Sequence, residues 1–172
     1  MADNKMTYIA VGVIAAVAVV AIVALVLLSD NEEGYDKYEG KYFIFDASGN
    51  SGPTTFDGTI KMEITEVKGS IATIVWTYDI YQTTSGVRTP YDLSALTKTS
   101  DLSKGGDAGV WQRSETLSTK WGPKTVDVYL EASGGNSNEA YVDKDDRNIL
   151  YKMVMTSGGN TITVTLSETN YI

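Results

Sequence analysis

The pattern of hydrophobic and polar positions divides this chain of 172 residues into two unequal parts. The first part holds an unbroken apolar run of 21 residues without a charge, at positions 8–28. A helix rises 1.5 Å per residue, so a run of this length spans roughly 31 Å, the thickness of a hydrocarbon core. A helix also pairs all of its own backbone groups, which lipid requires. The run therefore predicts one transmembrane α-helix.

A cleaved signal peptide is the alternative interpretation of this run. Its apolar part is shorter, about 7–15 residues, and a small-x-small cleavage site follows it. Here the run ends at Leu28 and continues with Ser29 and Asp30, which fits such a site poorly, so we expect an uncleaved anchor. Lys5 precedes the run, and the positive-inside tendency then places residues 1–7 in the cytoplasm and the rest of the chain outside the cell membrane.

After a short polar linker, residues 29–34, apolar and polar residues alternate. A period of two puts one face of a strand on a core and the other face in water, which is typical of antiparallel sheets. Turns rich in Gly and Asn separate the alternating runs and supply the positive φ that tight hairpins need. The predicted strands cover residues 38–46, 56–67, 70–83, 109–117, 123–132, 138–143, 148–156 and 161–168.

The sequence thus predicts an all-β ectodomain over residues 35–172, built as an antiparallel meander of about eight strands. The pattern leaves open whether the strands form one curved sheet, a barrel or a sandwich. One connection, residues 84–108, is long and contains Pro90 and a possible short helix around 91–97. Long connections in compact domains are often functional, so this segment is interpreted either as a lid over one face of the sheet or as a surface excursion.

Composition restricts the chemistry of this domain. The chain has no His and no Cys, which excludes thiol nucleophiles, disulfides and triads with an imidazole base. Phosphate-loop, dinucleotide and nucleophile-elbow signatures are also missing from the sequence, so we do not expect an enzyme. The net charge of −8 without a basic stripe argues against a nucleic-acid partner.

One acidic turn is a candidate cation site. Residues 143–148 gather four side chains with oxygen donors within six positions, and calcium prefers six to eight oxygen ligands from such loops. A polar hairpin turn, in which neighbouring basic residues partly neutralise the acids, explains the run as well. No other cofactor is expected. The candidate metal ligands are Asp143, Asp145, Asp146 and Asn148.

Aromatic side chains are the remaining candidates for a binding site. Large rings pack a thin core, but they also line apolar or carbohydrate-binding concavities. Trp111 opens a predicted strand whose other members are mostly polar, so a simple core explains it least. The candidate ligand-binding residues are Trp76, Tyr78, Trp111 and Trp121.

The second half also carries a resemblance to a known family. The segments WGPKTVDVY (121–129) and AYVDKDDRNILYKM (140–153), followed by a Gly turn and a strand ending in LSETN (166–170), resemble the LolA/LppX-like extracytoplasmic lipoprotein-carrier domains. They are also similar to small signal-anchored surface proteins of archaea. The carrier resemblance implies a curved antiparallel sheet that holds an apolar ligand under a lid.

Together these features predict a single-pass membrane protein with an external binding module for an apolar or glycan ligand at the cell envelope. The alternative is a non-catalytic structural or protein-interaction component of the cell surface. The expected partners are the lipid bilayer, through residues 8–28, and another envelope protein.

Overall fold

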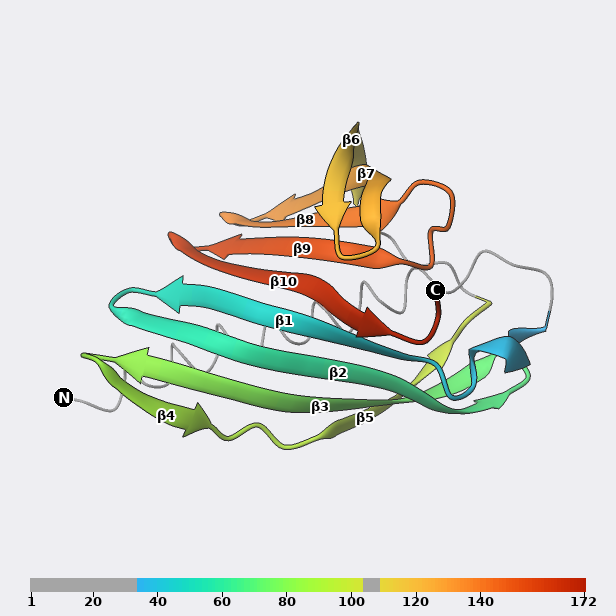
Figure 1. Cartoon of the computed structure of the whole chain (residues 1–172), viewed down its shortest axis with the longest axis horizontal. Coiled ribbons are helices and arrows are strands. Elements are labelled where there is room, and N and C mark those ends of the chain that lie inside the picture. Colours follow the sequence, from blue (N-terminus) through green and yellow to red (C-terminus); the bar gives the residue numbers. More distant parts are fainter. Residues whose placement is uncertain (1–33, 104–108) are drawn as a thin grey trace.

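The computed structural model describes residues 34–103 and 109–172, which form one ten-stranded antiparallel sheet preceded by the 3-10 turn η1 (Tyr35–Tyr38) (Figure 1). This confirms the predicted all-β antiparallel domain. The transmembrane helix predicted at 8–28 lies outside the described residues, and within them no helix is long and apolar enough to cross a membrane. The strands are β1 (Tyr42–Ser51), β2 (Thr54–Lys68), β3 (Ile71–Thr84), β4 (Val87–Tyr91), β5 (Leu96–Asp101), β6 (Val110–Thr119), β7 (Gly122–Ser133), β8 (Asn136–Asp143), β9 (Leu150–Ser157) and β10 (Asn160–Thr169).

The strand order joins two meanders in one sheet. Neighbouring strands run β4-β3-β2-β1-β10-β9-β8-β7-β6, and β5 pairs with β3 beside β4. Each meander is built from hairpins, and the pairing of β1 with β10 connects them in the middle. The sheet is curved and does not close, because β6 ends it on one side and β4 with β5 end it on the other (Figure 1). Of the three predicted architectures, the structure is therefore the single curved sheet.

Of the segment predicted as a long loop or lid, residues 84–108, the structure describes residues 84–103. These residues contribute two strands, β4 and β5, which lie end to end along the outer edge of β3, and no helix occupies residues 91–97. Both strands are largely exposed, so neither shows the alternation that reveals a half-buried strand. Pro90 also argues against a strand by sequence, yet proline is tolerated at a sheet edge because one side of its backbone needs no partner.

In β1, β2, β3 and β10 the core lies on one face of the sheet. Paired residues in neighbouring strands lie on the same face, so the buried alternate positions of β1, β2, β3 and β10 form continuous apolar rows. Burying each large side chain of this kind contributes roughly 1.5–3 kcal/mol. The largest fully buried side chains are Trp76, Tyr38, Tyr151, Phe45, Met62, Ile64, Ile74, Leu102, Leu150 and Met153.

Glycine allows the strands to approach closely at one point of this core. Gly58 in β2 lies between Ala47 of β1 and Ile80 of β3. A Cβ added at Gly58 would lie 2.0 Å from the backbone oxygen of Asp79 and 2.8 Å from the Cα of Ile80. Its φ of +151° is also one that residues with side chains rarely adopt. The sheet geometry here therefore requires glycine.

We expect Gly58→Ala to lower the free energy of unfolding by about 2–4 kcal/mol, because the new methyl group meets rigid backbone. Urea unfolding of the full chain, followed by tryptophan fluorescence, measures this loss. Ser48→Ala in β1, an exposed position, is the control and should change stability by less than about 0.5 kcal/mol. Equal urea midpoints for Gly58→Ala and the wild type would contradict the close approach.

Candidate functional site

Two of the predicted ligand-binding aromatics belong to the core. Trp76 is fully buried on the inner face of β3, where it pairs with Met62 of β2 and Leu96 of β5. Tyr78 follows two residues later on the same face and is half-buried. The indole nitrogen of Trp76 and the hydroxyl of Tyr78 have no hydrogen-bond partner, and burial raises the pKa of Tyr78 to about 12. Both side chains pack the sheet, and Trp76 offers no surface to a ligand from solvent.

Trp121 lies in the turn that joins β6 to β7. Its ring lies 6.1 Å from the ring of Tyr151, and the ammonium of Lys120 lies 4.7 Å above it. The Tyr151 hydroxyl in turn donates to Oδ2 of Asp143 at 3.0 Å. Burial, together with this bond to Asp143, raises the pKa of Tyr151 well above its ordinary value. The structure thus brings Trp121 close to the predicted cation turn, through Tyr151.

The predicted metal ligands in this turn mostly bind the turn itself. Oδ1 of Asp143 accepts hydrogen bonds from the backbone N–H groups of Asp145, at 2.8 Å, and Asp146, at 3.0 Å. Oδ1 of Asp146 accepts from the backbone N–H of Asn148 at 3.0 Å. Asp145 is exposed, and Oδ1 of the buried Asn148 has no hydrogen-bond partner. In the described ranges no group of three or more acidic side chains has the arrangement of a metal site.

Trp111 is the predicted ligand-binding residue that stays at the surface. It lies on β6, at the open end of the sheet, with 55% of its surface exposed, and it pairs with Tyr129 of β7. The same row continues through Ala140 of β8 and Met153 of β9 into the core. Within β7 the fully buried side chains, Val126 and Val128, lie on the opposite face, so Trp111 and Tyr129 lie on the more exposed face of the β6–β7 hairpin.

A carboxylate lies beside this exposed indole. Asp127 of β7 pairs with Ser114 of β6, whose hydroxyl donates to Oδ1 of Asp127 at 2.5 Å. The hydrogen bond from Ser114 is the main cause that holds the pKa of Asp127 below its ordinary value, and a bond from the Trp111 side chain adds to it. The charges of Lys144 and Arg147 act in the same direction. Trp111, Ser114, Asp127 and Tyr129 are called the Trp111 surface below.

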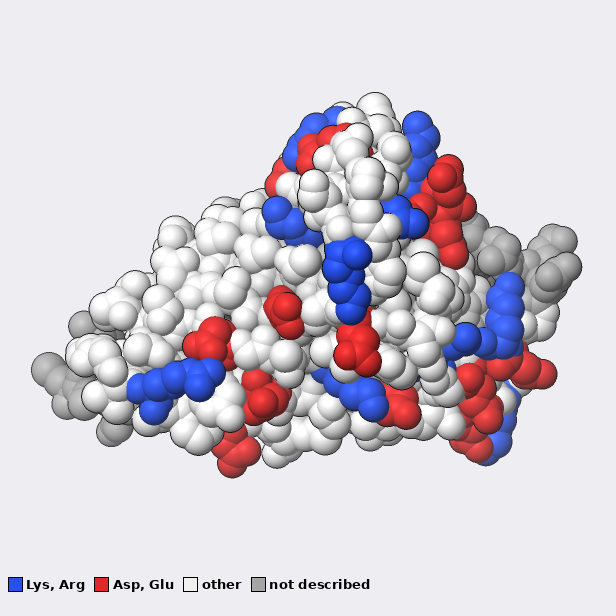
Figure 2. All heavy atoms as spheres, viewed as in Figure 1, with Lys and Arg blue, Asp and Glu red and all other residues white. Residues whose placement is uncertain are grey.

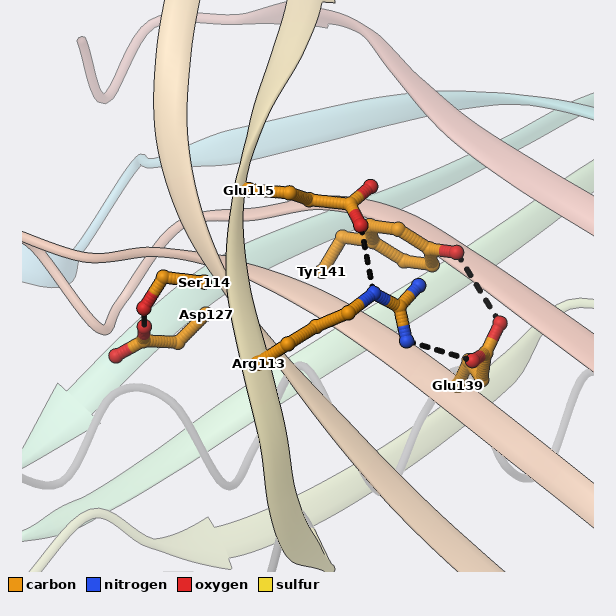
Figure 3. Close-up of polar contacts among 6 residues, drawn as sticks. All are labelled: Arg113, Ser114, Glu115, Asp127, Glu139 and Tyr141. Atoms are coloured by element: carbon orange, nitrogen blue, oxygen red, sulfur yellow. Dashed lines mark hydrogen bonds and ion pairs between the residues drawn. The ribbon is translucent and has the colours of Figure 1, made fainter.

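The opposite face of the same hairpin carries an ionic network. The guanidinium of Arg113 contacts Glu115 at 2.7 Å and Glu139 at 3.4 Å, and the Tyr141 hydroxyl donates to Glu139 at 3.1 Å. Figure 3 shows these four side chains on one side of the β6–β7 ribbon and the pair Ser114–Asp127 on the other. On the molecular face in Figure 2, acidic and basic spheres lie side by side at this end of the sheet.

The Trp111 surface combines groups suited to polar recognition. An exposed indole offers an apolar ring face, and an ionised carboxylate and a hydroxyl beside it accept or donate hydrogen bonds. Sequence reasoning singled out Trp111 but missed Ser114, Asp127 and Tyr129. The signal available was the alternation in β7, which places Asp127 and Tyr129 on one face, but the register that brings them opposite β6 depends on the bulge at Gln112.

Comparison with models of known protein families gave no match, and comparison with curated proteins gave none either. The resemblance to lipoprotein carriers therefore stays a prediction from the sequence.

We expect Ser114→Ala to raise the pKa of Asp127 toward its ordinary value of 3.8, because the strongest hydrogen bond to the carboxylate is lost. A carbon-13 NMR titration of the carboxyl group measures this change, with Ser118→Ala on the same strand as the control. The low pKa stabilises the fold above about pH 4, and this contribution disappears as pH falls through the folded-state pKa. An Asp127 pKa that is identical in wild type and Ser114→Ala would contradict the assigned cause.

For the acidic turn, we expect millimolar calcium to leave the melting temperature unchanged, because both oxygens of Asp143 already accept protein hydrogen bonds. Asp143→Ala should instead lower stability by about 1–3 kcal/mol, since it leaves buried donors without an acceptor. Differential scanning fluorimetry measures both. A calcium-dependent rise of several degrees that Asp145→Asn abolishes would restore the predicted calcium site.

Proposed function

We propose that this protein is a membrane-anchored, non-catalytic binding module outside the cell membrane, and that it binds a glycan at the Trp111 surface. One observation carries the proposal. At the open end of the sheet, a tryptophan with 55% of its surface exposed lies on the same face as the Asp127 carboxylate, which accepts a hydrogen bond from the hydroxyl of Ser114. Sugar rings present apolar C–H faces and hydroxyl groups together, and such a pair of groups matches both.

The arrangement favours a glycan over a fully apolar ligand. Apolar ligands bind in concave sites that enclose most of their surface. Trp111 has only one aromatic pairing partner, Tyr129, and its other neighbours on the same face are the hydroxyl of Ser114 and the carboxylate of Asp127. These polar groups would lose water without compensation against a hydrocarbon, whereas sugar hydroxyls replace that water. The predicted candidates Trp76, Tyr78 and Trp121 then support the sheet that presents Trp111.

We include a membrane anchor in the proposal because residues 8–28 are a long uncharged apolar run and the domain that follows them is acidic. A net charge of −8 disfavours contact with anionic lipid headgroups and keeps the domain off the bilayer. A domain held in this way meets ligands that extend from the cell surface. Glycans of the envelope have that location.

Trp111→Ala should weaken glycan binding about tenfold or more, because it removes the ring on which the sugar packs. An array of neutral and acidic oligosaccharides, probed with the full chain in detergent, identifies a ligand, and titration calorimetry measures its affinity. Trp111→Phe keeps a ring and should retain part of the affinity.

Val87→Ala, at the exposed far edge of the sheet, is the control and should bind as the wild type does. Wild-type affinity in Trp111→Ala, or no retained oligosaccharide at all, would contradict the proposed function.

A further inference from the structure

We propose that two copies of this protein pair edge to edge through β6, in antiparallel register with Ser114 of one copy opposite Ser114 of the other. The proposal goes beyond glycan binding and does not depend on it. It rests on the open edge of β6, on the faces to which its side chains point, and on the complementary order of those side chains along the strand.

β6 is the more suitable of the two ends of the sheet for such pairing. It has ten residues, pairs only with β7 among the described strands, and leaves Val110 and Trp111 exposed at 69% and 55%. An edge strand of this length presents a row of backbone N–H and C=O groups to a further strand. The other end is divided between β4, with five residues, and β5, with six, and Pro90 removes one donor from β4.

The faces of β6 are fixed by its pairing with β7. Arg113 and Glu115 pair with Val128 and Val126 and share one face, whereas Ser114 pairs with Asp127 on the other. In an antiparallel pair, directly opposed residues lie on the same face. Between two copies of β6, a residue can therefore lie opposite only its own equivalent or another residue on its own face. Arg113 opposite Glu115 is one such allowed pair.

The charges select one of these registers. Centring the two-fold axis on Arg113 or on Glu115 places two like charges directly opposite each other, which is destabilising. Centring it on Ser114 instead places Arg113 of each copy opposite Glu115 of the second copy. The arrangement forms two ion pairs across the new interface, and both partners are related by the two-fold axis, as a closed dimer requires.

The bulge in β6 extends this agreement to the ends of the strand. The register with β7 shifts between Trp111 and Arg113, so Gln112 is an extra residue and the pairing skips it. With that shift, Trp111 lies opposite Thr116 of the second copy, and Val110 lies opposite Leu117 of the second copy. The two residues of each pair lie on the same face of the sheet. The first pair combines an aromatic with a β-branched side chain, the second combines two apolar side chains, and both kinds of pair stabilise cross-strand contacts.

The strand therefore has a self-complementary order around Ser114. The interface covers Val110, and it places Thr116 of the second copy beside Trp111. Pairing also continues the sheet from one copy into the next and places the two Trp111 surfaces on one face. Two copies held side by side in a membrane meet at a high effective concentration, which favours such a modest interface.

Charge reversal tests the register in the full chain. Arg113→Glu alone and Glu115→Arg alone each place like charges opposite each other, so each should weaken the dimer about tenfold or more in sedimentation equilibrium in detergent. Mixing the two variants restores both ion pairs and should give a heterodimer. Arg88→Glu in β4, which reverses a paired charge at the far edge, is the matched control and should leave the dimer intact.

Disulfide trapping gives an independent readout, because the natural chain has no cysteine. Ser114→Cys places two thiols opposite each other, within the distance a disulfide spans, and should form a covalent dimer on oxidation. Leu117→Cys faces Val110 of the second copy and should not. Monomers in the wild type, dimers that persist in both single charge variants, or equal trapping at both cysteines would overturn the proposal. None of these results bears on glycan binding, which the oligosaccharide titration measures separately.

Discussion

The pairing of β1 with β10 is the interaction on which the rest of this structure depends. It joins residues more than a hundred positions apart, such as Ser48 with Thr163, whereas the other pairings lie within one meander or the other. Side-chain amides fix both ends of the pair: Oδ1 of Asn170 accepts the backbone N–H of Tyr42 at 2.8 Å, and Oδ1 of Asn160 accepts that of Gly52 at 3.1 Å. Without this pairing, β1 and β10 would each be an unpaired edge strand. Each meander would also carry only its own part of the apolar face. Because the paired residues lie so far apart in the sequence, this pairing gives the fold a high contact order, which slows folding.

Because β1 and β10 pair in the middle of the strand order, the two free edges lie at opposite ends of the sheet, one at β6 and the other at β4 and β5. The end at β4 and β5 is short, interrupted and carries Pro90, all features that limit edge-to-edge pairing. The end at β6 is long and presents an exposed tryptophan on one face and an ionic network on the other. Both proposals concern this end: we propose a glycan for the face of the hairpin that carries Trp111, and a second copy of the chain for the backbone edge of β6. The pairing in the centre of the sheet therefore determines which strands form its free edges.

The sequence predicts the part of this fold that hydrophobic periodicity controls. The strands with one buried face, such as β2 and β3, alternate clearly and were placed within a few residues, and turns such as Gly158-Gly159 marked the hairpins. The exposed strands β4 and β5 lack that signal because neither face is buried. The candidate site was predicted only in part for a related reason. Trp111 stood out by its polar neighbours, but its neighbour Asp127 is set by cross-strand register and by a bulge, neither of which one sequence reveals. The acidic turn shows the same limit, since composition cannot tell ligands for a cation from carboxylates that cap their own backbone, as Asp143 does.

Amide hydrogen exchange of the full chain tests most directly whether the two meanders form one sheet. If β1 and β10 hold them together, the slowest amides of β1, β2, β9 and β10 should exchange at one common rate, through global unfolding, and should respond equally to urea. Amides at the outer edge of β4 should exchange much faster. Two separate rates, one for the slowest amides of β1–β3 and another for those of β8–β10, would show that the meanders open independently and would contradict the central pairing.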